Sequence, residues 1–263
     1  MKLLTILAMF FTLAPACYAE GEDAITLDPG VQQRLADALK NYRPQGASLK
    51  LTELHQIDNV GNFGKVVEYQ RDATWARQDS GLWAIVAVGG FTSGGANGMS
   101  QTLSLCGLLP LLTAVSSTTQ VNIPLATRFG PFMMRHVVNV GRRGRVTDFR
   151  TEYGDICSPS PGAKFTYQFD NEVQIRTSSR TVTGKATLDV SCEVASDAAP
   201  ATQLAPSFRG DYLRVSCENV AKSGQKTGYL YAFLREPGVY LTLSESGSNQ
   251  STKMQYKAVE YGP

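Results

Sequence analysis

The sequence has little of what metal and catalytic centres are usually built from. It contains only two histidines in 263 residues. It has no Cys-x-x-Cys or His-x-x-x-His pair with the spacing of zinc ligands, and no Gly-x-Ser-x-Gly nucleophile elbow. We therefore expect no metal and no cofactor, and we favour a protein that is not an enzyme.

Charge is also sparse. Only 18% of the residues are charged and the formal net charge is +2, so the chain lacks the basic surplus of a nucleic-acid-binding protein, and we expect no nucleic-acid partner. No apolar run after the first residues reaches the length of a membrane-spanning helix. Once its leader is removed, the chain is not expected to be transmembrane.

The leader itself has the pattern of a secretory signal peptide. Lys2 precedes an apolar run from Leu3 to Leu13, and Cys17-Tyr18-Ala19 offers small residues at the cleavage positions. We predict that residues 1–19 are removed and that the protein is periplasmic or secreted. The alternative is a lipoprotein anchored at Cys17, with Ala14-Pro15-Ala16-Cys17 as its lipid-attachment box.

Cysteine usage agrees with export. Of five cysteines, Cys17 lies in the leader, and the remaining even number suits an oxidising compartment. Val-Ser-Cys-Glu occurs at 190–193 and again at 215–218, and each cysteine is in phase with the apolar positions of its strand. We predict disulfides Cys106–Cys157 and Cys192–Cys217. No cysteine is left over to act as a nucleophile.

The region from 158 to 263 is predicted to be an antiparallel β-meander. Apolar residues recur at every second position, the period of a strand with one buried face. Phe165, Tyr167 and Phe169 are an example. The run from Tyr229 to Leu234 is apolar at all six positions, so that strand is expected to be covered on both faces. Ser196 to Gly210, with two prolines, is expected to be a long surface loop.

The region from 20 to 157 is predicted to be α+β. Asp28 and Pro29 start an amphipathic helix that ends near Arg43, and short strands follow. The glycine-rich stretch from Gly89 to Gly98 is interpreted as a connector, because it lacks the ending of a phosphate-binding loop. Ser104 to Val115 is compatible with a kinked helix or with two strand ends. The whole chain is thus mainly β, in two regions or in one continuous domain.

In layout, a leader followed by an amphipathic helix and a long antiparallel sheet resembles periplasmic carriers of the lipoprotein-chaperone type. That resemblance implies an open half-barrel wrapped around a helix. It covers no specific motif, and this chain departs from it in its cysteines and its glycine-rich stretch.

The most concentrated chemical feature is basic. A predicted hairpin around Gly141–Gly144 gathers several arginines, and guanidinium groups bind phosphates and carboxylates through paired hydrogen bonds. We therefore expect an exported cell-envelope protein that binds an anionic or amphiphilic ligand, or a protein partner, through a curved sheet. The partner would be an envelope lipid, a glycan or a protein. The candidate binding residues are Arg135, Arg142, Arg143, Arg145 and Arg150.

Two alternatives stay open. One is an envelope hydrolase whose site assembles from distant residues, with Glu193, Glu218 or His136 as the candidates. The other is a secreted inhibitor or immunity-type module that presents the loop from Ser196 to Gly210.

Overall fold

In the computed structural model the described residues form one α-helix and twelve β-strands. The structure describes residues 27–40, 42, 48–59, 66–91, 96–127, 130–248 and 250–262, so the predicted leader, residues 1–19, lies outside the described residues. The elements are α1 (Pro29–Ala38), β1 (Ser48–Asn59), β2 (Val66–Arg77), β3 (Trp83–Phe91), β4 (Ala96–Leu105), β5 (Leu109–Thr127), β6 (Gly130–Tyr153), β7 (Lys164–Thr177), β8 (Thr181–Pro200), η2 (Ala201–Gln203), β9 (Asp211–Ala221), β10 (Lys226–Leu234), β11 (Val239–Ser246) and β12 (Gln250–Gly262).

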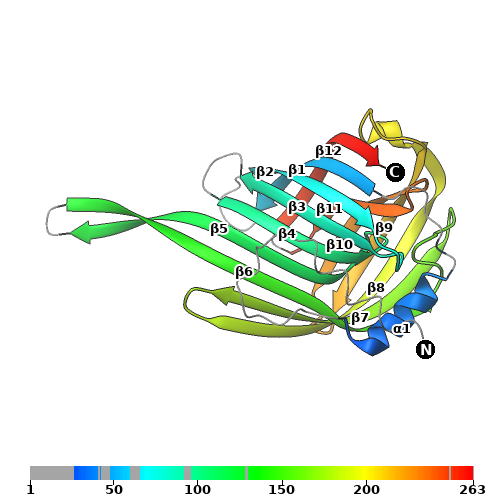
Figure 1. Cartoon of the computed structure of the whole chain (residues 1–263), viewed down its shortest axis with the longest axis horizontal. Helices are drawn as coiled ribbons and strands as arrows, with labels where there is room; N and C mark the ends of the chain where they lie inside the picture. Colours follow the sequence, from blue (N-terminus) through cyan, green and yellow to red (C-terminus); the bar gives the residue numbers. More distant parts are fainter. Residues whose placement is uncertain are drawn as a thin grey trace.

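The strands form a closed antiparallel barrel (Figure 1). Each strand pairs with the next along the chain, and β12 returns to pair with β1 over the whole length of both. The regions 20–157 and 158–263 contribute β1–β6 and β7–β12 to this one sheet. The mainly β prediction is confirmed in its coarse form. The open half-barrel around a helix, implied by the layout resemblance, is wrong, because β1 and β12 close the sheet and α1 contacts β6.

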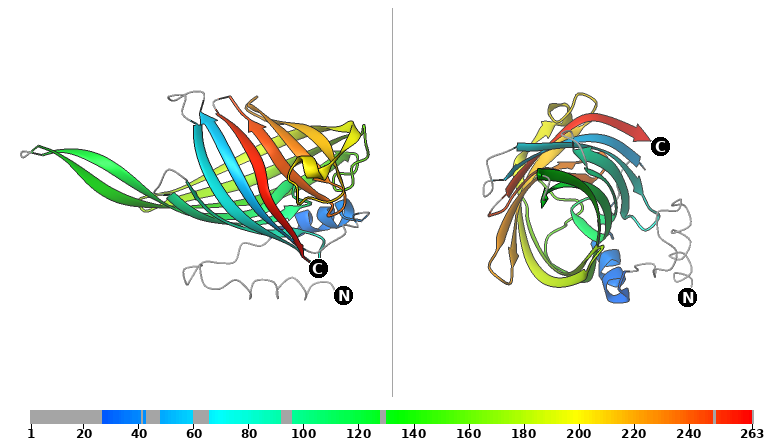
Figure 2. Two further views of the ribbon diagram at one scale, coloured as in Figure 1. Left: turned by 90° about the horizontal axis from the view of Figure 1, so that it is seen from above. Right: turned by 90° about the vertical axis from the view of Figure 1, so that its left-hand side faces the viewer.

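Two hairpins project from one end of the barrel. The β5–β6 pair extends furthest, and the β7–β8 pair lies beside it (Figures 1 and 2). The predicted hairpin around Gly141–Gly144 is wrong, since β6 runs unbroken from Gly130 to Tyr153. Both glycines are paired within the sheet, and the last pair of the real β5–β6 hairpin is Thr127 with Gly130.

At the opposite end the barrel is divided into two cores. Strands β11 and β12 pair through residues 244–246 and 251–253. Apolar side chains of the first half of β11 instead pack in the same core as the buried apolar side chains of β1 and β12. Tyr231 and Phe233 of β10 pack in one core. Ala232 and Leu234, on the other face of the same strand, pack in a second core with Leu49. The prediction that this strand is covered on both faces is confirmed.

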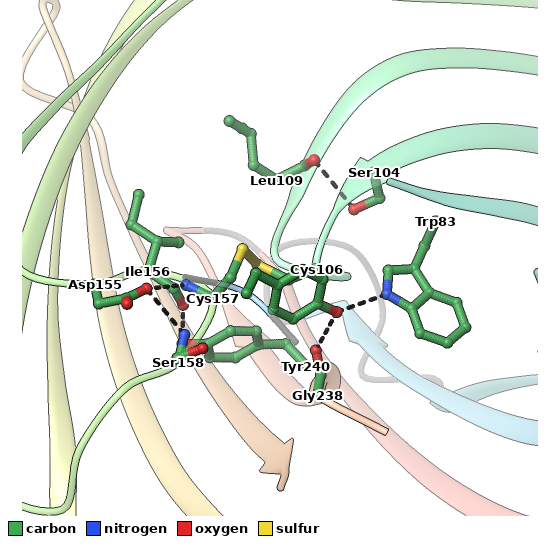
Figure 3. The surroundings of a disulfide bond; sticks show 11 residues. Trp83, Ser104, Cys106, Leu109, Asp155, Ile156, Cys157, Ser158, Gly238 and Tyr240 are labelled. Carbon is green, nitrogen blue, oxygen red and sulfur yellow. Dashed lines mark hydrogen bonds between the residues drawn. A yellow bond between two sulfur atoms is a disulfide. The ribbon is translucent and has the colours of Figure 1, made fainter. Parts of the chain in front are cut away.

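Both predicted disulfides are present. Cys192 and Cys217 are directly opposed on β8 and β9, with their side chains buried inside the barrel. Cys106–Cys157 joins the β4–β5 turn to the β6–β7 connection (Figure 3). Beside it, Tyr240 donates a hydrogen bond of 2.6 Å from its hydroxyl to the carbonyl of Ile156. Two disulfides indicate an oxidising environment outside the cytoplasm.

The apolar stretch from Ser104 to Val115 consists of two strand ends. Between them the chain turns at Cys106 and Gly107, both with positive φ. Gly107 is required there, because a Cβ atom would lie 2.6 Å from the carbonyl oxygen of Tyr240. The kinked-helix alternative is therefore excluded.

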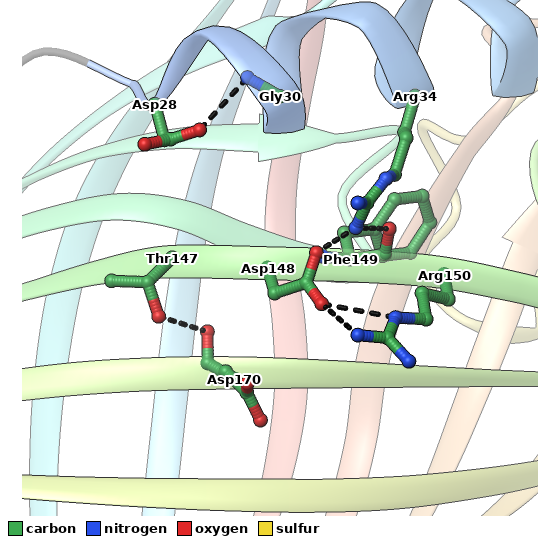
Figure 4. A network of polar contacts seen from close by, with 8 residues as sticks. All are labelled: Asp28, Gly30, Arg34, Thr147, Asp148, Phe149, Arg150 and Asp170. Atoms are coloured by element: carbon green, nitrogen blue, oxygen red, sulfur yellow. Dashed lines mark hydrogen bonds and ion pairs between the residues drawn. The ribbon is translucent and has the colours of Figure 1, made fainter.

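Helix α1 is short and is held against β6. Asp28 caps its first turn, as the sequence predicts, by accepting a hydrogen bond of 2.8 Å from the amide of Gly30. Val31 and Leu35 are its buried residues. Arg34 forms an ion pair with Asp148 of β6 and donates to the carbonyl of Phe149 (Figure 4). The helix ends at Ala38, several residues before the predicted Arg43.

Parts of two expected loops are paired in strands or buried instead. Strand β8 continues to Pro200 through a register shift, and the segment that follows packs inward through Ala201, Ala205 and Phe208. The surface loop predicted for Ser196–Gly210 is therefore wrong for its buried second half. Gly89 and Gly98 pair with each other across β3 and β4, so the two ends of the glycine-rich stretch lie in strands.

No helix in the described residues is long and apolar enough to cross a membrane.

Candidate functional site on the inner face of the barrel

The inward-facing positions of β1 and β2 change from apolar to polar along the strands. On β1, Leu49 and Leu51 are followed at the same alternation by Glu53 and His55. On β2, the partners of these residues are Trp75, Ala73, Arg71 and Tyr69, in the same order. The barrel therefore has an apolar inner face at one end of these strands and a polar inner face towards the other.

A hydrogen-bonded network occupies this polar face. Glu53 and His55 are each about 1% exposed. The carboxylate of Glu53 accepts from the guanidinium of Arg71 and lies 2.8 Å from Nε2 of His55. Nδ1 of His55 is 3.0 Å from the hydroxyl of Tyr69, and the two rings stack with centroids 4.4 Å apart. The geometry supplies a continuous path for a proton between Tyr69 and Glu53.

The charge in this network is compensated within the fold. Burial alone would raise the pKa of Glu53, but the hydrogen bond from His55 and the charge of Arg71 lower it below its usual value. Glu53 is therefore ionised at neutral pH. Gly89 of β3 lies opposite Arg71, and a Cβ atom at Gly89 would come within 2.6 Å of the Cβ of Arg71. That glycine leaves room for the arginine beside β3.

A second polar group on the inner face is Glu245 of β11. It pairs across the sheet with Tyr229 of β10, whose hydroxyl is 3.4 Å from its Oε1. Tyr229 stacks on Tyr231 with ring centroids 5.8 Å apart. Burial, followed by the negative charge of Glu245, raises the pKa of Tyr229. Within the described part of the chain, no cationic nitrogen lies within 4.0 Å of the Glu245 carboxylate.

A row of side chains at the projecting end combines apolar and cationic groups. Arg142 on β6 is paired with Ile175 on β7, and Ile175 with Val182 on β8. Ile175 is in phase with the buried Phe169, and Arg142 with the buried Val146, so the row continues the inner face of the barrel. Ile175 is 41% exposed and Val182 is 49% exposed. Arg142 is also exposed and has no ion-pair partner among the described side chains.

The strand alternation separates the arginines that the sequence grouped together. Arg143 and Arg145 point to the outer face of β6, where Arg145 lies 3.2 Å from a carboxylate oxygen of Glu172. Arg150 is bound by Asp148 at 2.7 Å, in a groove between α1 and β6. The side chains of Arg135 and His136 lie outside the described residues. Among the candidate arginines with described side chains, Arg142 alone joins the inner-face row.

The two carboxylates proposed for a hydrolase lie on the outer face. Glu193 is opposite Ser216, and Glu218 is opposite Ser191, so the two acids are diagonal neighbours, as like charges prefer. Glu193 is paired with Lys164, and Glu218 is paired with Lys226. Both are exposed, each has its own cation, and the histidine whose side chain the structure describes, His55, is buried on the inner face instead.

Sequence reasoning missed the residues of the inner polar face. The signal was present in the alternation, because Glu53 and His55 continue the phase of Leu49 and Leu51, where apolar residues would be expected. Arg71 and Tyr69 continue the phase of Trp75 in the same way. A change from apolar to polar at inward positions of neighbouring strands would have identified the network before the structure.

Comparison of the chain with protein-family models, with curated proteins and with solved structures finds no match. The function is therefore argued from the chemistry of the inner face alone.

Proposed function

We propose that the protein is an exported cell-envelope binding protein that holds a single-chain anionic amphiphile on the inner face of its projecting end. The observation that carries this proposal is the row formed by Arg142, Ile175 and Val182. The predicted leader, together with the oxidising environment indicated by the disulfides, supports a periplasmic or secreted location.

The row matches the two halves of such a ligand. Ile175 and Val182 present branched apolar side chains that are among the most exposed large hydrophobic residues described, and covering them with an acyl chain removes apolar surface from water. Arg142, beside them, offers an exposed guanidinium group for a carboxylate or phosphate. Further along the same face are the half-buried Val173 and the buried Phe169, so the apolar track continues into the barrel.

The outer face supplies matched controls. Arg143 is the next residue along β6 but points to the other side of the sheet. Val88 of β3 is 56% exposed and is out of phase with the buried Ala87, so it lies on the outer face. Changes at these positions alter charge and hydrophobicity without altering the inner row.

A fluorescent anionic amphiphile, dansyl-labelled undecanoate, tests the proposal by direct titration. We expect saturable binding to the wild type and a Kd about fivefold higher for Arg142→Ala, because a charge-assisted contact at an exposed site is worth about 1 kcal/mol. Arg143→Ala should bind like the wild type. Equal affinities of the two variants would show that the ligand does not bind at Arg142 and its row.

A second candidate function is hydrolysis inside the barrel, favoured by the chain of contacts from Tyr69 through His55 to Glu53. In that case Tyr69 would exchange a proton with His55, and Glu53 would stabilise the protonated imidazole. A panel of chromogenic esters and glycosides distinguishes the two functions. Turnover that Tyr69→Phe abolishes, and that Glu193→Gln and Glu218→Gln leave intact, would favour hydrolysis.

A further inference from the structure

Glu245 is half-buried on the inner face of the barrel, and no lysine or arginine nitrogen of the described residues lies within 4.0 Å of its carboxylate. The other carboxylate of that face, Glu53, has the guanidinium of Arg71 beside it. On the outer face, Glu172, Glu193 and Glu218 are each within 4.0 Å of a lysine or arginine nitrogen. Among the described side chains, the polar partner of the Glu245 carboxylate is the hydroxyl of Tyr229, at 3.4 Å. A half-buried carboxylate in this position would gain from a cation supplied from outside.

The groups around Glu245 are aromatic. Tyr229 lies directly across from it on β10, and Tyr231 stacks on Tyr229 with an interplanar angle of 14°. The two rings therefore lie nearly parallel, with Tyr229 opposite the carboxylate and Tyr231 two residues further along β10. Tyr69 approaches from β2, close enough that the charge of Glu245 contributes to the raised pKa of its phenol. Tyrosine faces attract organic cations through the ring quadrupole.

We propose that Glu245, with Tyr229 and Tyr231, forms a binding site for an alkylammonium group. The carboxylate supplies the counter-charge and the half-buried ring of Tyr229 contacts the carbon atoms bound to nitrogen, while the buried Tyr231 supports Tyr229 from behind. Such a group is carried by amines and by quaternary ammonium compounds, and the pairing of a carboxylate with aromatic rings selects them over a bare metal ion. This site is separate from Arg142, so it does not depend on the proposed binding of an anionic amphiphile.

Choline and its neutral carbon isostere 3,3-dimethylbutan-1-ol provide the test, because they share a shape and differ in charge. Isothermal titration calorimetry of the full chain should show choline binding in the millimolar range or tighter, and at least tenfold weaker binding of the neutral alcohol. In Glu245→Gln the Tyr229 hydroxyl keeps an oxygen to bond, so the fold is retained. Its affinity for choline should fall about tenfold.

Glu218→Gln is the matched control, because it removes an outer-face carboxylate of the same kind, and it should bind choline like the wild type. Equal binding of choline and its isostere would overturn the proposal, as would undiminished choline binding by Glu245→Gln or no choline binding by the wild type. The melting temperature of Glu245→Gln verifies that the variant is folded. Titration of the same variant with dansyl-labelled undecanoate separates failure of this site from failure of the amphiphile proposal.

Discussion

Replacing Ile175 and Val182 by threonine tests the apolar half of the inner-face row. Complete burial of a valine or isoleucine side chain is worth about 1.5–3 kcal/mol. Val182 is 49% exposed and Ile175 is 41% exposed, so covering what remains of each contributes about 1 kcal/mol. Together they contribute about 2 kcal/mol to binding an acyl chain, and we expect the double variant to raise the Kd on the order of thirtyfold.

The design of this variant keeps folding and binding apart. Threonine favours strands, and both positions are exposed, so the free energy of unfolding should change by less than about 1 kcal/mol. The assay is titration with dansyl-labelled undecanoate, with Val88→Thr as the control on the outer face. If Val88→Thr weakens binding as much as the double variant does, or if the double variant binds like the wild type, then the acyl chain does not lie on this row.

Two further predictions concern stability. Replacing both Cys192 and Cys217 by alanine should lower the free energy of unfolding by about 3.5 kcal/mol, because the disulfide links residues 25 apart in sequence and restricts the unfolded chain. Urea unfolding measures this loss, and a value below about 1 kcal/mol would contradict the prediction. Because the pKa of Glu53 is lowered in the folded protein, its ionised form adds stability that is present above the unfolded value, near 4.5, and is lost as the pH falls below it. Glu53→Gln should therefore be less stable than the wild type at neutral pH by about 3 kcal/mol. Its free energy of unfolding should also fall less than that of the wild type on acidification. Parallel pH profiles of the two proteins would show that Glu53 does not cause the loss of stability in acid.

Local patterns predicted most of the strands and the Cys192–Cys217 disulfide, and Cys106–Cys157 followed as the remaining pair. Alternation identified the inward positions of β7, β8 and β9, and the phase of Cys192 and Cys217 placed them on the same face. The helix start followed from the capping residue Asp28 and from Pro29. These features depend on neighbours in sequence or on one strand pair, which is why they can be found without the fold.

Closure of the barrel could not be predicted in the same way. It depends on pairing between β1 and β12, which are separated by nearly the whole chain and carry no matching motif. The error at Gly141–Gly144 has a different cause. Glycine and arginine together are typical of a turn, but here the glycines lie within a strand. Gly144, for example, is flanked by the side chains of Thr113 and Val173.

The candidate site was only partly accessible from sequence. Arg142 was named, but it was grouped with Arg143 and Arg145 because a hairpin tip would expose all of them on one surface. A continuous strand instead divides them between two faces. The grouping of side chains around Glu245 could not be predicted from the sequence. Tyr69, Tyr229 and Glu245 come from three strands that only the closed sheet brings together.

The central claim is that an anionic amphiphile lies on the inner face of the projecting end, and photo-crosslinking with a diazirine-bearing fatty acid tests it most directly. After irradiation and digestion, mass spectrometry identifies the labelled peptides. The account predicts label on β7 and β8 around Ile175 and Val182, reduced in Arg142→Ala and unchanged in Arg143→Ala. Label concentrated on the outer face of β3 and β4, around Val86 and Val88, would contradict it.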